Sequence, residues 1–213
     1  ASTLPVTVAD MVYHTQNVAR ANSHALILCD LPFMSVATLE RALDSAQAVM
    51  QAGAHVVKIE GGSELANIVA TLATNGVPTC VHLGLTPQSV NVFGGYKVQG
   101  KTESQADKLM ADCAAVVNAG AALLLLECVP AELAKKVRET FPVPVIGIGA
   151  GVDCDGQVLV MHDMLGVYTR KPAKFVKNFL HDEGNQTHDI TGAFRAYHQA
   201  VKERTFPTLE HSF

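Results

Sequence analysis

One pattern occurs twice in this chain of 213 residues. Residues 51–60 read QAGAHVVKIE, and residues 118–127 read NAGAALLLLE. Each copy follows a stretch whose apolar residues recur at helical spacing, and each contains a glycine suited to a left-handed helix cap. A short apolar run and a terminal glutamate come next. The repeat therefore predicts a helix, a glycine, a buried strand and a carboxylate, in that order, twice.

Other segments fit the same template less completely. Helices are expected over 63–75 and 130–141, and six strand candidates end near Asp30, Glu60, Leu83, Glu127, Gly149 and Asp163. Strands that alternate with helices predict βαβ units around a parallel sheet. An open doubly wound sheet and an eight-stranded barrel both satisfy this order. Carboxylates that recur at strand ends favour the barrel, because it brings many strand ends to one mouth.

The pattern changes after Gly166. Residues 174–180 and 190–204 are expected to form amphipathic helices. We therefore expect one barrel domain over 1–213, with a helical extension over about 174–213 packed outside it. Six strands do not close an eight-stranded barrel, so two units are expected to precede residue 1. Four aromatic residues of the extension exceed what the barrel needs and indicate either subunit contacts or core packing: Phe175, Phe179, Phe194 and Tyr197.

Charge, hydropathy and cysteine usage argue against several classes of protein. Sixteen Lys and Arg against twenty Asp and Glu give a net charge of −4, which argues against a nucleic-acid or anionic-membrane binder. The longest apolar run, residues 121–126, is far shorter than the ~20 residues of a membrane helix. Five cysteines without C-x-x-C spacing indicate reduced thiols, and hence a cytoplasmic protein.

Charged residues stand close together on one predicted strand. Lys58 and Glu60 are two residues apart, so both side chains point to the same face. They form either a buried ion pair or a cation-assisted site for an anionic substrate. Asp30 and Glu127 end neighbouring strands in the same way, which favours the second reading. The carboxylates of Asp30 and Glu60 are hard oxygen ligands that suit Mg²⁺.

Glu127 follows four leucines. Desolvation there should raise its pKa and make it a competent general base, although a capping or salt-bridged glutamate fits the same position. His82 either faces the mouth or is a hydrogen-bonded core histidine. His162 and Asp163 look like a ligand pair, but adjacent strand residues point to opposite faces. The glycine-rich segment 83–101 is where a lid or a cosubstrate contact is expected.

Several segments together resemble the ketopantoate hydroxymethyltransferase family. The resemblance covers essentially the whole chain, and its most specific part is the nineteen-residue stretch 82–100. The matching segments are STLPVTVADMVYHT (2–15), DLPF (30–33), VKIEGG (57–62), HLGLTPQSVNVFGGYKVQG (82–100), LECVPAELAK (126–135), IGIGAG (146–151) and DGQVLVMHDMLG (155–166).

The resemblance implies a (β/α)₈ TIM barrel of the phosphoenolpyruvate-mutase-like superfamily. It implies hydroxymethyl transfer from 5,10-methylenetetrahydrofolate to 3-methyl-2-oxobutanoate, giving 2-dehydropantoate in pantothenate biosynthesis through a Mg²⁺-stabilised enolate. By motif position, Asp30 and Glu60 match magnesium ligands, Asp30 and Lys58 match contacts to the keto acid, and Glu127 matches the proton acceptor. A homo-oligomer, a decamer of two pentameric rings, is also implied.

One family motif has no counterpart in the chain. A V-G-D-S-type strand end supplies a further metal-ligand Asp and a substrate-binding Ser in the family, and it is expected before residue 1. Two other hypotheses therefore remain beside the transferase. One is a lyase or mutase of the same superfamily acting on another 2-oxo acid, which folate dependence of product formation would distinguish. The other is an inactive barrel serving as a scaffold.

Overall fold

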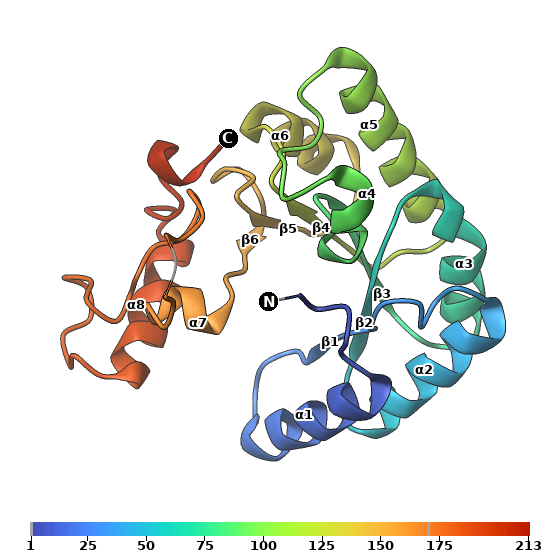
Figure 1. Cartoon of the computed structure of the whole chain (residues 1–213), viewed down its shortest axis with the longest axis horizontal. Helices are drawn as coiled ribbons and strands as arrows, with labels where there is room; N and C mark the ends of the chain where they lie inside the picture. The colour runs from blue at the N-terminus through green and yellow to red at the C-terminus, as the bar shows by residue number, and fades with distance from the viewer. Residues whose placement is uncertain (1, 170) are drawn as a thin grey trace.

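The computed structural model describes residues 2–169 and 171–213, and it contains a curved parallel sheet with helices along its outer side (Figure 1). Six strands pair in chain order, each parallel to the next. This order is that of successive βα units, in which every crossover leads to the adjacent strand. The strands are β1 (Leu28–Asp30), β2 (Val56–Glu60), β3 (Thr79–Gly84), β4 (Leu123–Glu127), β5 (Val145–Ile148) and β6 (Gly156–Gln157).

Among the described residues, eight α-helices lie before, between and after the strands. The two copies of the repeat form α2 with β2 and α5 with β4, as predicted. Gly53 and Gly120 follow these helices with φ of +112° and +104°, a backbone conformation that glycine adopts without strain. The helices are α1 (Val8–Ala21), α2 (Leu39–Gln51), α3 (Ala66–Thr74), α4 (Val90–Phe93), α5 (Glu103–Asn118), α6 (Ala131–Thr140), α7 (Met161–Met164) and α8 (Ile190–Lys202).

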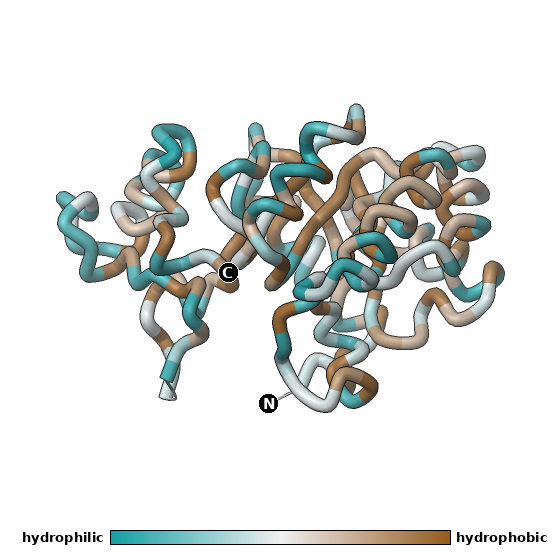
Figure 2. Tube along the Cα trace, turned by 90° about the horizontal axis from the view of Figure 1, so that it is seen from above, coloured by the Kyte–Doolittle hydropathy of each residue, from teal (hydrophilic) through white to brown (hydrophobic). Residues whose placement is uncertain are grey.

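The two faces of the sheet are buried in different ways. Alternate residues such as Val57, Ile59 and Leu124 point outward into the main core beneath the helices. The residues between them point inward. Four of these form a second apolar cluster, which we call the inner floor: Val56, Cys80, Leu125 and Ile148. In the hydropathy-coloured trace, hydrophobic segments gather in the interior of the larger part of the molecule and hydrophilic ones lie mostly toward its outside (Figure 2). The inward residues above the floor are therefore the ones available for chemistry.

Residues beyond β6 form a smaller body with a core of its own. Met164, Phe179, Ala193 and Phe206 are buried together there, and Figure 1 shows α7 and α8 to the left of the sheet. The aromatic residues singled out in the sequence divide accordingly. Phe179 and Tyr197 pack in this core, and Phe175 packs against the inner floor. Phe194 is 44% exposed, so core packing accounts for three of the four aromatics and only Phe194 is left for a surface contact.

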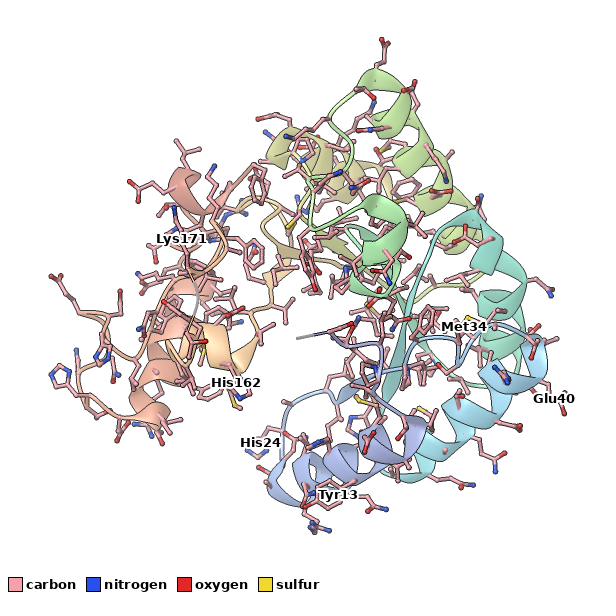
Figure 3. The ribbon with its side chains drawn as sticks, viewed as in Figure 1. Tyr13, His24, Met34, Glu40, His162 and Lys171 are labelled. Atoms are coloured by element: carbon pink, nitrogen blue, oxygen red, sulfur yellow. The ribbon has the colours of Figure 1, made fainter. Side chains whose placement is uncertain are left out.

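Two sequence predictions for this region are wrong. Residues 157–166 do not form a strand ending at Asp163, because β6 ends at Gln157 and residues 161–164 are helical. His162 therefore lies exposed on α7, away from the other strand ends (Figure 3). Residues 174–180 form no helix, because this stretch is irregular and inserts Phe179 into the C-terminal core. No helix in the described ranges is long and apolar enough to cross a membrane.

Candidate active site

The inward residues at the ends of β1 to β4 meet above the inner floor. Asp30 ends β1, Lys58 and Glu60 lie on β2, His82 lies on β3 and Glu127 ends β4. All five line one cavity of about 590 Å³. The register explains their proximity, because Asp30 pairs with Lys58 and Glu60 pairs with His82 across adjacent strands. Parallel strands end at the same edge, so side chains of the same orientation converge there.

Lys58 is the central cation of this group. Its Nζ lies 3.1 Å from Oδ2 of Asp30 and 3.8 Å from Oε1 of Glu60, and the side chain is 9% exposed. Burial alone would lower the pKa of Lys58, but the two carboxylates outweigh it and raise the pKa above its usual value. The lysine therefore stays charged, and its neighbours offset the cost of burying it.

Glu60 is held by a segment that the sequence marked only as a loop. The backbone N–H of Gln88 donates to Oε2 of Glu60 at 2.9 Å, and the Gln88 side chain donates to the Leu31 carbonyl at 2.9 Å. Burial raises the pKa of Glu60 despite Lys58 and His82 nearby. No side-chain motif signals the role of Gln88, because the donor to Glu60 is a backbone group.

His82 lies between the charged residues and is 3% exposed. Its Nδ1 is 3.2 Å from Nζ of Lys58 and 3.8 Å from Oε1 of Glu60. Its Nε2 is 3.3 Å from Oε2 of Glu127, yet the contact does not meet the geometry of a hydrogen bond. Burial and the Lys58 ammonium lower the pKa of His82 to about 3, so the ring is neutral near physiological pH.

Glu127 has the most apolar surroundings of the three carboxylates. Its side chain is 13% exposed and follows the leucines of β4. Burial raises the pKa of Glu127 to about 7, against the lowering influence of Lys58. A carboxylate with a pKa near the working pH can both accept and release a proton. The alternative of a capping glutamate does not describe it, because no side-chain cap forms at the following helix α6.

The side chains predicted as metal ligands are brought together, but the donor set is small. Asp30 and Glu60 both lie around Lys58, and their oxygens are the hard donors that Mg²⁺ prefers. Over the described ranges, no group of three or more His, Cys, Asp or Glu side chains is arranged to hold a metal ion. Two carboxylates with the remaining positions left to water and substrate fit magnesium rather than a closed structural zinc site.

Fold and site together define an enzyme of the parallel (β/α)-barrel class, with acid–base groups at the carboxyl ends of its strands. A solved structure of the same fold is a putative phosphonomutase from Burkholderia cenocepacia J2315, with a TM-score of 0.53 at 19% identity over 67% of this chain and 62% of that one. This likeness concerns the fold alone, and it confirms the predicted barrel class for the six strands described.

The sequence relatives identify the family. The family model for ketopantoate hydroxymethyltransferase matches residues 1–209. The 3-methyl-2-oxobutanoate hydroxymethyltransferase of Psychrobacter cryohalolentis is 65% identical over 212 residues, covering 100% of this chain and 80% of the relative. The enzyme of the same name from Acinetobacter baylyi is 60% identical over 213 residues, covering 100% and 79%. The chain belongs to the ketopantoate hydroxymethyltransferase family, and the resemblance inferred from its motifs is confirmed.

Proposed function

We propose that the chain transfers a hydroxymethyl group from 5,10-methylenetetrahydrofolate to 3-methyl-2-oxobutanoate, with water consumed and 2-dehydropantoate and tetrahydrofolate formed. This is a step of pantothenate biosynthesis. Family membership supports the reaction class. The observation that carries the proposal is a glutamate with a pKa of about 7 in the same cavity as a buried lysine. Such a pair suits proton removal next to a carbonyl of an anionic substrate.

Lys58 is proposed to bind the carboxylate of the keto acid, and Asp30 is proposed to contact the same keto acid. An ammonium carries three donors, and in the free site two of them face Asp30 and His82. Oε1 of Glu60 lies farther away, at 3.8 Å, so the third donor can turn to an anion in the cavity. Because Lys58 is almost fully buried, its attraction for an anion is screened little by solvent.

Glu127 is proposed as the base that removes the C3 proton of 3-methyl-2-oxobutanoate. The ionised carboxylate takes the proton, and the electron pair left on C3 then attacks the methylene carbon carried by the folate. Hydrolytic release frees tetrahydrofolate. The apolar surroundings of Glu127 raise its basicity, and holding both substrates in one cavity supplies much of the rate gain.

Magnesium is the proposed cofactor, held by Asp30 and Glu60. When bound, it would supply a Lewis acid at the keto oxygen that acidifies the C3 proton. The charges of the site fit this cofactor. With a neutral His82 ring and an ionised Glu127, the Lys58 ammonium and the three carboxylates leave two negative charges. A divalent cation offsets both, which lowers the cost of burying these charges beside an anionic 2-oxo acid.

We also propose that copies of the chain assemble into a homo-oligomer, the decamer that the motif resemblance implies. Phe194 and Ile190 on α8 are exposed apolar residues that suit a subunit contact. Light scattering at micromolar concentration tests this part alone, and a monomer would contradict it.

The test of the reaction has two steps. The first follows deuterium wash-in at C3 of 3-methyl-2-oxobutanoate without folate, and we expect exchange that depends on the protein. The second adds 5,10-methylenetetrahydrofolate and measures 2-dehydropantoate, which should form only with the folate present. Exchange without folate-dependent product would indicate a lyase or mutase acting on a 2-oxo acid. Absence of both would contradict the proposed function.

A further inference from the structure

His82 has no assigned part in the reaction, yet it is the only side chain described that touches both the cation and the proposed base. Nδ1 lies 3.2 Å from the Lys58 ammonium and Nε2 lies 3.3 Å from Oε2 of Glu127. The His82 side chain is 3% exposed, and its Nε2 has no well-aligned hydrogen-bond partner within residues 2–169 and 171–213, although the backbone of Leu85 lies near enough to raise the pKa of the ring. A buried polar atom without a partner is costly, so its place in the cavity calls for a functional explanation.

The Lys58 ammonium determines which nitrogen of His82 carries the proton. An ammonium group can only donate hydrogen bonds. At 3.2 Å from Nζ, Nδ1 must therefore be the acceptor and carry no proton. A neutral imidazole with an unprotonated Nδ1 has its proton on Nε2. The resulting N–H lies on the nitrogen 3.3 Å from Oε2 of Glu127, although it is not aligned for a hydrogen bond in the structure.

We propose that His82 is a positioning residue for Glu127. Its Nε2–H, fixed by Lys58, holds one carboxylate oxygen of Glu127, so that the other oxygen faces the substrate. This inference rests on the proposed function, because it assumes that Glu127 takes the C3 proton. The contact is close but poorly aligned, and hydrogen bonds of catalytic groups often align only when substrate is bound.

The same geometry limits where the substrate proton can go. Since Nε2 already carries a proton, it cannot accept one from Glu127. The proton taken from C3 therefore stays on Glu127 and is not passed along the row to Lys58. His82 acts by orienting the carboxylate rather than by relaying protons.

The first test reads the tautomer directly and does not depend on catalysis. Nitrogen-15 NMR of the full chain with labelled histidine distinguishes a protonated Nε2 from a protonated Nδ1, and His82→Gln identifies the His82 signals by their loss. We expect the Nε2–H form. His55 provides an internal reference, because its Nδ1 accepts a hydrogen bond from the Ile27 N–H at 3.0 Å and its ring must carry the same tautomer when neutral. A proton on Nδ1 of His82 would overturn the proposal.

The second test measures C3 exchange in two variants. His82→Leu removes the donor, and misplacement of the base should lower the maximal exchange rate about 10–100-fold while the KM for the keto acid changes less than about twofold. His82→Gln can accept from Lys58 and donate to Glu127, so it should restore most of the rate. A merely structural histidine would not be rescued in this way.

A matched control places the same change elsewhere. His55 lies just before the start of β2, so His55→Gln should leave exchange unaltered. Thermal unfolding of each variant verifies folding. Exchange in His82→Leu within twofold of the unaltered chain would overturn the positioning role of His82 and leave the proposed function standing. Absence of both exchange and folate-dependent product in the unaltered chain would overturn the proposed function itself.

Discussion

The two copies of the sequence repeat end in the same residue and place it in different surroundings. Glu60 follows Lys58 by two positions, so a cation shares its face of the strand, and Gln88 donates to it from above. Glu127 follows Leu125 by two positions, and the pKa of Glu127 rises to about 7. Burial raises the pKa of both glutamates, but Glu60 also has the Lys58 ammonium on its own strand and a backbone donor, and its pKa rises less than that of Glu127.

The largest expected effect comes from removing the proton acceptor. Glu127→Gln keeps the size of the side chain and removes its basicity, so C3 exchange should fall about 10²–10⁴-fold. Binding of the keto acid should persist, because Lys58 is unchanged. Deuterium wash-in measures the first quantity and calorimetric titration the second. Undiminished exchange would mean that another group is the base.

The corresponding change in the other copy should act on the cation. Glu60→Gln removes one of two charged oxygen ligands, so the affinity for Mg²⁺ should fall about 10–100-fold. Titration calorimetry with MgCl₂ and the keto acid measures it. Glu127→Gln is the matched control and should bind Mg²⁺ like the unaltered chain. Equal losses in both variants would show that the two glutamates are not specialised.

The difference between the two glutamates should become smaller when a lysine is placed two positions before Glu127 on its strand. In the unaltered chain, exchange should rise with pH and be half-maximal near the Glu127 pKa of about 7, because only the ionised carboxylate takes a proton. In Leu125→Lys, an ammonium beside Glu127 favours the charged form, so the midpoint should move down by about one pH unit or more. The pH profile of the wash-in rate measures it, and Leu125→Met should leave the midpoint in place.

The smallest effects concern the cap glycines of the repeat. Gly53 and Gly120 both have positive φ, but a Cβ on Gly53 would lie 2.7 Å from Cβ of Ala19, against 3.2 Å between Gly120 and Ala73. Gly53→Ala should therefore lower the free energy of unfolding by roughly 2–3 kcal/mol and Gly120→Ala by roughly 1–2 kcal/mol. Urea denaturation measures both.

A third glycine separates strain from crowding. Gly76 has φ of +78° with no neighbour within 4 Å of an added Cβ, so Gly76→Ala should report backbone strain alone. A cost for Gly53→Ala no greater than that of Gly76→Ala would contradict the steric argument.

Periodicity predicted the strands that lie in the middle of the sheet. β2 and β4 have long apolar runs bounded by glycine and carboxylate, and the structure has them where the repeat placed them. The run after Gln157 failed, because three consecutive apolar residues fit an irregular segment that lines the cavity, and residues 158–160 do so. Helix α1 was not expected, although Thr7 and Asp10 form a capping box that marks its start.

The sequence predicted the part of the candidate site that follows from the alternation of side chains along each strand. Counting by two along each strand selected Lys58 and Glu60 together with Asp30 and Glu127 at strand ends, and these four side chains do lie in one cavity. Their roles in binding and catalysis stay predictions. The tautomer of His82 and the contact from Gln88 lay outside such reasoning, because both depend on distances between strands that the sequence does not contain.

Gln88 also couples the position of the loop after β3 to the orientation of the Glu60 carboxylate. One residue donates its backbone N–H to Glu60 and its side-chain amide to the carbonyl that follows β1. A displacement of the loop would turn the carboxylate, and a ligand that fixes the carboxylate would fix the loop. Linkage requires these two influences to be equal in free energy. Binding of a ligand at the strand ends is thereby coupled, through the single residue Gln88, to the loop at the molecular surface.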